Sequence, residues 1–171
     1  PAVSIVLPVR NAERFLSASI ESLLAQSFRD FELIAIDDGS SDGSLAILRA
    51  HARTDARIRI VSRPNRGVTP TLNEGIALAR GRYLARMDAD DVALPERLRL
   101  QVQALDASPE LVAIGGQLVL IDVQDRVLTE MRMPTDHAEI DAAHLAGPGA
   151  AICHPTATIR LDAMRAVGGY D

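Results

Sequence analysis

One apolar segment that stops at a cluster of carboxylates constrains the fold of this chain more than any other feature. Residues 83–87 have the apolar character of a buried strand, and Asp88, Asp90 and Asp91 follow within four positions. Carboxylates this close repel one another unless a cation lies among them. Because oxygen ligands suit Mg²⁺ and Mn²⁺, the run predicts a divalent-cation site in a cleft. A solvated acidic turn is the alternative when so short a motif is taken alone.

A second apolar run ends in the same way. Residues 31–36 lead into Asp37 and Asp38, and a Gly-Ser pair typical of a tight turn follows. In a chain that alternates strands with helices, both acidic ends would lie along one edge of a parallel sheet. Ligands bind at that edge in open α/β folds. We therefore expect Asp37, Asp88 and Asp90 to converge on one cleft.

The spacing of apolar residues predicts strands that alternate with helices in the first half of the chain. Asn11 is expected to cap the first helix, and Thr69 followed by Pro70 is expected to open the third. The expected strands cover residues 3–9, 31–37, 58–62 and 83–87, and the expected helices cover residues 15–24, 40–52, 70–79 and 95–107.

This alternation ends after residue 110. Residues 111–121 and 127–133 read as consecutive strands around a turn, which favours antiparallel pairing. The expected fold class is therefore α/β, with a doubly wound and mostly parallel sheet in the first half and a mixed second half. The remaining expected elements are a helix over residues 135–145, a Gly/Pro loop over 146–151, a strand over 157–160 and a helix over 161–167.

Length, charge and cysteine content limit the classes of function. With 171 residues, of which 47% are hydrophobic, the chain fits one globular domain with a real core. A net charge of −5 without a basic run argues against nucleic acid or an anionic membrane as the main partner. Cys153 is the single cysteine, so a disulfide framework is excluded and a reducing, cytoplasmic setting is expected. No apolar stretch approaches the ~18 residues of a membrane span.

Several short motifs occur together and in order. They are Pro-Val-Arg-Asn at residues 8–11, Asp-Asp-Gly-Ser at 37–40, Asn65 with Gly67, Asn73, and Asp-Ala-Asp-Asp at 88–91. Each is weak alone, but the ordered set is specific, and with it the chain resembles the family 2 glycosyltransferases, in particular the bacterial surface-polysaccharide members. Further matches extend the resemblance over nearly the whole chain, at residues 95–97, 115–116, 154–156 and 168–171.

The resemblance implies the GT-A fold, which binds nucleotide sugars, as a single domain over residues 1–171. Residues 1–91 would form the nucleotide-binding half, and residues 92–171 the start of the acceptor-side half. The implied activity is metal-dependent, inverting transfer from a nucleotide diphosphate sugar, with a UDP-sugar expected, to an acceptor hydroxyl in polysaccharide or glycolipid biosynthesis. The cytoplasm is the expected location, or the inner face of the cytoplasmic membrane where the acceptor is lipid-linked.

The resemblance also implies roles for individual residues. Asp37 would accept a hydrogen bond from N3 of uracil, because an ionised carboxylate can only accept. Asp88 would face the ribose or the sugar, and Asp90, with Asp88, would bind Mn²⁺ or Mg²⁺. The base and ribose pocket would be lined by Pro8, Val9, Arg10 and Asn11, and the other expected nucleotide-sugar contacts are Asp38, Gly67, Asn73, Arg86 and Ala89.

Some of these residues have a plain structural alternative. Asp38 and Asn73 serve turns as readily as ligands. Arg86 stands at a strand position where an unpaired buried charge is costly, so it should contact an acid or a phosphate.

The resemblance places the general base of the reaction beyond the turn at residues 168–171, so the chain is expected to stop short of it. Within the chain, His154 and Asp171 are the candidates. A nucleotide-sugar-binding module without turnover is the alternative function. An acidic pocket of a phosphorylated signalling domain is a third reading, which the absence of lysine and the second acidic strand end both disfavour.

Overall fold

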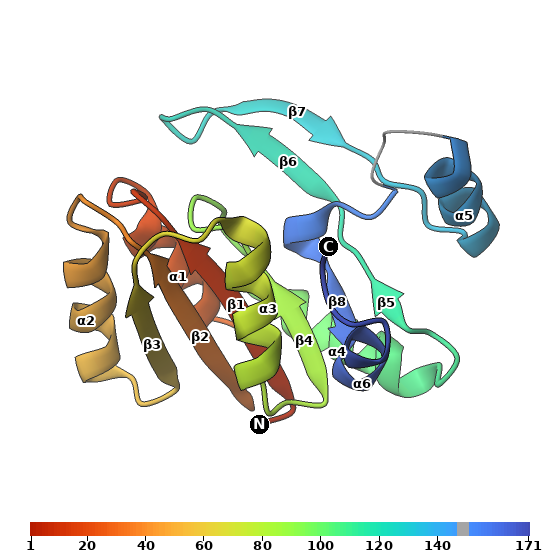
Figure 1. Cartoon of the computed structure of the whole chain (residues 1–171). Helices are drawn as coiled ribbons and strands as arrows, with labels where there is room; N and C mark the ends of the chain where they lie inside the picture. The colour runs from red at the N-terminus through yellow and green to blue at the C-terminus, as the bar shows by residue number, and fades with distance from the viewer. Residues whose placement is uncertain (147–150) are drawn as a thin grey trace.

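The computed structural model describes residues 1–146 and 151–171 and has an α/β fold built on one six-stranded mixed sheet (Figure 1). The strand order is β3-β2-β1-β4-β8-β5. β1 pairs in parallel with β2 and β4, β2 pairs in parallel with β3, and β8 is antiparallel to both β4 and β5. The strands are β1 (Val3–Val9), β2 (Phe31–Asp38), β3 (Ile58–Arg63), β4 (Tyr83–Arg86), β5 (Ala113–Ile114) and β8 (Thr158–Arg160).

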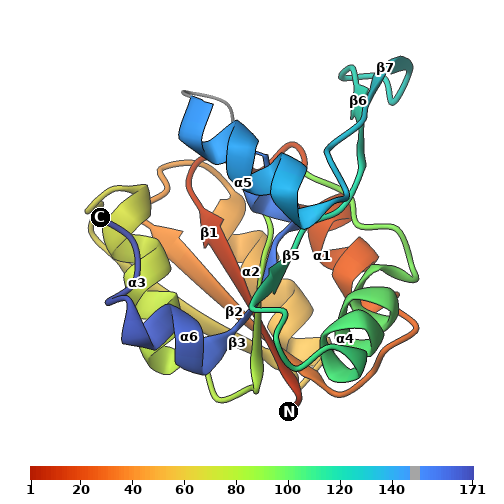
Figure 2. The ribbon, with the colours of Figure 1, turned by 90° about the vertical axis from the view of Figure 1, so that its right-hand side faces the viewer.

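Helices cover both faces of this sheet (Figure 2). Side chains of a strand point alternately to opposite faces, so Ile5 and Leu7 of β1 pack with α1, α2 and α4, whereas Val6 packs with α3 and α6. Burial on both faces explains the apolar run from Leu33 to Ile36 in β2. The doubly wound first half is thus confirmed. The helices are α1 (Leu16–Leu24), α2 (Ser44–Thr54), α3 (Val68–Leu78), α4 (Arg97–Ala107) and α6 (Leu161–Ala166).

Two predicted helix caps are wrong, and α2 begins at Ser44 instead of at the expected residue 40. Asn11 does not cap α1, because its own backbone is left-handed (φ 50°) and its Oδ1 accepts a hydrogen bond from the Ser41 N–H at 2.8 Å. Helix α1 begins only at Leu16. Helix α3 begins one residue before Thr69, with Gly67 as its N-cap at φ 93°, a conformation that glycine adopts without strain.

The predicted strand over residues 111–121 is also wrong as a single element. Its first part is β5, which pairs with β8 in the main sheet, and its last part is β6 (Leu118–Ile121), which pairs antiparallel with β7 (Val127–Met131) in a separate hairpin. Gly115 and Gly116 separate the two parts. A Cβ on Gly115 would lie 2.8 Å from the Ile152 side chain, and the Gly116 N–H donates to Thr156 Oγ1 at 2.9 Å. This close approach turns the chain out of the main sheet.

The β6–β7 hairpin stands away from the six-stranded sheet in both views (Figures 1 and 2). Its antiparallel pairing confirms the prediction made for these residues. Helix α5 (His137–Ala146) follows it, and most of the predicted loop over 146–151 lies outside the described residues. A short 3₁₀ helix, η1 (His154–Thr156), precedes β8. In the described part of the chain, every helix is too short or too polar to cross a bilayer.

A buried carboxylate ties the sheet together at its amino edge. Glu32 is 3% exposed, and its oxygens accept hydrogen bonds from Ser4 Oγ at 2.7 Å, Arg59 at 2.9 Å and Arg80 at 2.7 Å. Burial alone would raise the pKa of Glu32, but the hydrogen bonds from Arg80, Ser4 and Arg59 outweigh it and lower the pKa to about 2. The charged form of Glu32 therefore stabilises the folded protein.

We expect Glu32→Gln to destabilise the protein at neutral pH by at most about 3 kcal/mol, reduced by solvent screening at the exposed Arg80. Because the folded pKa lies below the unfolded value, this contribution is complete above pH 4.5 and is lost as the pH falls toward 2. Denaturant unfolding of the parent and the variant at pH 7 and pH 3 measures it, with the exposed Glu110→Gln as control. An equal difference at both pH values would contradict the assignment.

Candidate functional site

The carboxyl ends of β1, β2 and β4 meet at one edge of the sheet. Val9 is in register with Asp37, and Val6 is in register with Arg86, so the acidic turn after β2 and the acidic motif after β4 flank the end of β1. A cavity of about 220 Å³ opens at this edge. Its lining residues are Pro8, Val9, Arg10, Asp38, Asn65, Gly67, Val68, Thr71 and Asp88.

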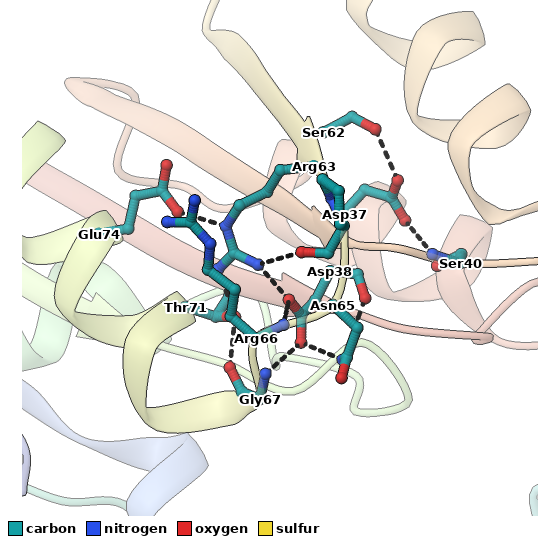
Figure 3. A network of polar contacts seen from close by, with 11 residues as sticks. Asp37, Asp38, Ser40, Ser62, Arg63, Asn65, Arg66, Gly67, Thr71 and Glu74 are labelled. Carbon is teal, nitrogen blue, oxygen red and sulfur yellow. Dashed lines mark hydrogen bonds and ion pairs between the residues drawn. The ribbon is translucent and has the colours of Figure 1, made fainter.

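Asp38 organises the wall of this cavity (Figure 3). Its carboxylate accepts hydrogen bonds from the Arg63 guanidinium, from Asn65 Nδ2 at 2.7 Å, and from the backbone N–H groups of Arg66 at 2.8 Å and Gly67 at 3.0 Å. These four donors fill the acceptor positions of one carboxylate. Burial would raise the pKa of Asp38, but the bonds from Arg66, Arg63 and Gly67 lower it overall. The loop over residues 63–67 is thereby held against the end of β2.

Asp37 lies behind this wall. It is 2% exposed, and its two oxygens accept hydrogen bonds from the Ser40 N–H at 3.1 Å and from Ser62 Oγ at 2.8 Å (Figure 3). Asp37 is not among the residues that line the cavity, whereas Asp38 is. The predicted contact between Asp37 and a nucleotide base stays a prediction, and the structure places Asp38 at the cavity wall.

Arg63, which the sequence analysis did not single out, completes the network. It is paired with Asp38 in the parallel register of β2 and β3. Its guanidinium also donates to Glu74 at 2.6 Å and to Thr71 Oγ1 at 2.8 Å. The predicted strand stopped at residue 62, one residue short of this arginine. An acidic end of one strand beside a basic end of the next is the signal that could have revealed the pair.

The acidic motif contains three carboxylates in different environments. Arg86 forms an ion pair with both oxygens of Asp88, at 2.5 Å each. Asp90 is exposed, and Asp91 is half-buried. Burial, and then the charges of Asp88 and Asp90, raise the pKa of Asp91. Ala89 between them is buried.

Arg97 is a half-buried arginine next to this motif, and the sequence analysis matched it within residues 95–97 without giving it a role. It donates to the backbone oxygen of Arg86 at 2.7 Å. Burial lowers the pKa of Arg97 to about 10, so it stays charged at neutral pH. Two guanidinium groups thus offset part of the negative charge of Asp88, Asp90 and Asp91.

The carboxylates of Asp88 and Asp90 suit a hard divalent cation that would also be bound by oxygens of a ligand. Across the described residues, no three His, Cys, Asp or Glu side chains converge into a preformed metal cage. Mg²⁺ and Mn²⁺ need no such cage, because they are usually held by one or two carboxylates together with phosphate oxygens and water. The exposed Asp90 beside Asp88 offers such a partial site.

The turn at residues 168–171 docks on α3. The Asn73 amide donates to the Tyr170 carbonyl at 2.8 Å and accepts from the Tyr170 N–H at 2.8 Å. A Cβ on Gly169 would lie 2.4 Å from Asn73 Oδ1, so the turn requires glycine there. His154 Nε2 lies 2.8 Å from the Tyr170 hydroxyl, and burial lowers the pKa of His154. Asn73 therefore has a structural role, and Asp171 is exposed at the end of this turn.

The fold and this site can now be compared with known proteins. Residues 4–167 match the family described as Glycosyl transferase family 2. The chain belongs to this family. It is 34% identical to the EpsE protein of Bacillus subtilis (strain 168), with 99% of this chain and 60% of EpsE covered. It is 36% identical to glycosyltransferase GlyG of Streptococcus pneumoniae, with 67% of this chain and 38% of GlyG covered. The chain thus spans less than two thirds of these family 2 relatives.

Solved structures of glycosyltransferases share the fold. The structure of S. aureus TarS 1-349 in complex with UDP-GlcNAc superposes with a TM-score of 0.75 at 20% identity, covering 99% of this chain and 48% of that one. Mannosyltransferase PcManGT from Pyrobaculum calidifontis, in complex with GDP-Man and Mn²⁺, superposes with a TM-score of 0.73 at 19% identity, covering 100% of this chain and 48% of that one. The predicted GT-A fold of this family 2 domain is confirmed.

Proposed function

We propose that this domain transfers a sugar, with inversion, from a nucleotide diphosphate sugar to an acceptor hydroxyl. The observation that carries the proposal is the cavity at the carboxyl edge of the sheet, which has the Asp38 network on one side and the Asp88 carboxylate on the other. The match to family 2 supports it, as do the similar structures that were solved in complex with GDP-Man and with UDP-GlcNAc. A UDP-sugar is the proposed donor. A saccharide or lipid-linked saccharide of polysaccharide or glycolipid biosynthesis is the proposed acceptor.

The two sides of the cavity would bind different parts of the nucleotide sugar. The side formed by Pro8, Val9 and the loop that Asp38 holds would receive the base and the ribose. Polar groups on this side would contact the edge of the base, since a buried polar contact discriminates strongly between partners that satisfy it and partners that do not. Asp37 supports this side from behind, through Ser40 and Ser62.

The acidic motif would receive the diphosphate and the metal. Asp90 is the proposed protein ligand of Mn²⁺ or Mg²⁺, and Asp88 is proposed to accept a hydrogen bond from a hydroxyl of the ribose or sugar. A bound divalent cation supplies charge that stabilises the departing diphosphate. In-line attack also needs a general base on the acceptor side. The family resemblance assigns this base to an acidic residue after the turn at residues 168–171.

Thermal unfolding with a panel of nucleotides and nucleotide sugars tests the proposal. UDP and UDP-sugars at about 100 times Kd should raise Tm by about 5–10 °C with Mn²⁺ and much less with EDTA. Comparable shifts with GDP compounds would contradict the choice of uridine, and no shift with any nucleotide would contradict the function. Binding without release of UDP in the presence of an acceptor would favour the non-catalytic binding module.

A further inference from the structure

Arg86 links the end of β4 to the acidic motif and is only 7% exposed. Its backbone N–H donates to the Ala157 carbonyl at 3.0 Å, and its carbonyl accepts from Arg97 at 2.7 Å. β4 is also in register with β1 here, where Arg86 lies opposite Val6. Neighbouring segments therefore fix the main chain of Arg86, and with it the point from which the side chain extends.

The guanidinium of Arg86 is committed to Asp88. Its two terminal nitrogens lie 2.5 Å from the two carboxylate oxygens, in the two-pronged geometry that makes such pairs strong and directional. The third nitrogen, Nε, is buried and has no hydrogen-bond partner among the described residues. A buried arginine in this state needs its carboxylate, because loss of the partner would leave an uncompensated charge.

This pair changes what Asp88 can bind. Each carboxylate oxygen has two acceptor positions, so Arg86 leaves one position on each oxygen for a neutral donor such as a sugar hydroxyl. A divalent cation at the same oxygens would face the guanidinium charge at close range, and burial of the Arg86 side chain limits the screening of that repulsion by water. Asp90, in contrast, is exposed, and within the part of the chain that the structure describes its carboxylate makes no hydrogen bond or ion pair.

We propose that Arg86 is a positioning residue that reserves Asp88 for a ribose hydroxyl of the bound nucleotide and directs the divalent cation to Asp90. This inference rests on the nucleotide-sugar transfer proposed above. It assigns Arg86 no contact with the diphosphate, because both terminal nitrogens are engaged and the side chain is 8% exposed.

The test uses two readouts on the parent, Arg86→Gln, Asp88→Asn and the double variant. Electron paramagnetic resonance measures Mn²⁺ binding without nucleotide, and calorimetry measures UDP binding at saturating Mn²⁺. In Arg86→Gln, the released Asp88 becomes an additional metal ligand, so Mn²⁺ alone should bind at least as tightly as in the parent. UDP should bind about tenfold more weakly. The double variant should bind UDP no more weakly than Asp88→Asn, because both changes remove the same contact.

Three results would overturn the inference. The first is unchanged UDP binding in Arg86→Gln, and the second is weaker binding of Mn²⁺ alone in that variant. The third is an additive loss of UDP affinity in the double variant, because additivity would indicate an independent contact between Arg86 and the diphosphate. Arg86→Lys keeps the buried charge without the two-pronged geometry and should weaken UDP binding about threefold; binding equal to that of the parent would also overturn it. Circular dichroism verifies that each variant folds. If Arg86→Gln does not fold, the two single variants Arg86→Lys and Asp88→Asn provide the test. A parent that binds no UDP with Mn²⁺ contradicts the proposed function instead.

Discussion

Replacing Asp90 with asparagine is expected to remove the contribution of Mn²⁺ to UDP binding. The Asp90 carboxylate is exposed beyond the end of β4, outside the set of residues that line the cavity, and it follows an Asp88 whose oxygens are paired with Arg86. An amide keeps the shape of the side chain but loses the charge that attracts a hard cation. We expect UDP to bind about 100-fold more weakly at saturating Mn²⁺, which corresponds to about 2.7 kcal/mol.

Calorimetry with and without Mn²⁺ measures this loss. The informative quantity is the ratio of the two UDP affinities, which should be large in the parent and close to one in Asp90→Asn. Asp141→Asn is the matched control, because Asp141 is an exposed carboxylate on α5 and the same charge is removed there. A ratio in Asp90→Asn equal to that of the parent would show that the cation is held elsewhere.

The sheet and its edge could be predicted from the sequence because apolar runs report burial directly. β2 is buried on both faces, so its residues from Leu33 to Ile36 are all apolar, and the two aspartates that follow mark the carboxyl end of the strand. The fold of the second half of the chain was predicted less accurately. The pair Gly115-Gly116 carries no apolar signal, and only the contacts with Ile152 and Thr156 show why the chain leaves the main sheet there.

The site could be predicted in position but not in detail. Asp38, Gly67 and Asp88, which come from separate motifs, line one cavity, whereas Asp37 and Asp90, which were expected to converge there with Asp88, do not line it. Which of two adjacent aspartates faces that cavity depends on the twist and pleat of the strand end, and the sequence pattern of two carboxylates is the same in either case. Arg63 was missed, and Arg97 was given no role, because in a sequence an arginine that packs inside a site looks like any surface arginine until its partner is known.

The two aspartates at the end of β2 should therefore respond very differently to asparagine. All four acceptor positions of Asp38 are filled by donors, so an amide NH₂ at that place would face N–H groups of residues 63–67. Asp37 has one N–H donor and the Ser62 hydroxyl, which can rotate to accept from an amide. Asp38→Asn should cost about 3 kcal/mol of unfolding free energy and Asp37→Asn less than about 1 kcal/mol.

Denaturant unfolding of both variants measures the stability difference, and calorimetry with uridine and with UDP measures the effect on the site. Because Asp38 holds the loop over residues 63–67 that lines the cavity, Asp38→Asn should weaken uridine and UDP about equally, by about tenfold or more. Asp37→Asn should leave the loop in place, so any loss of uridine binding there would report a direct contact between Asp37 and the base. Equal destabilisation by the two substitutions would show that the four-donor network around Asp38 does not hold the loop.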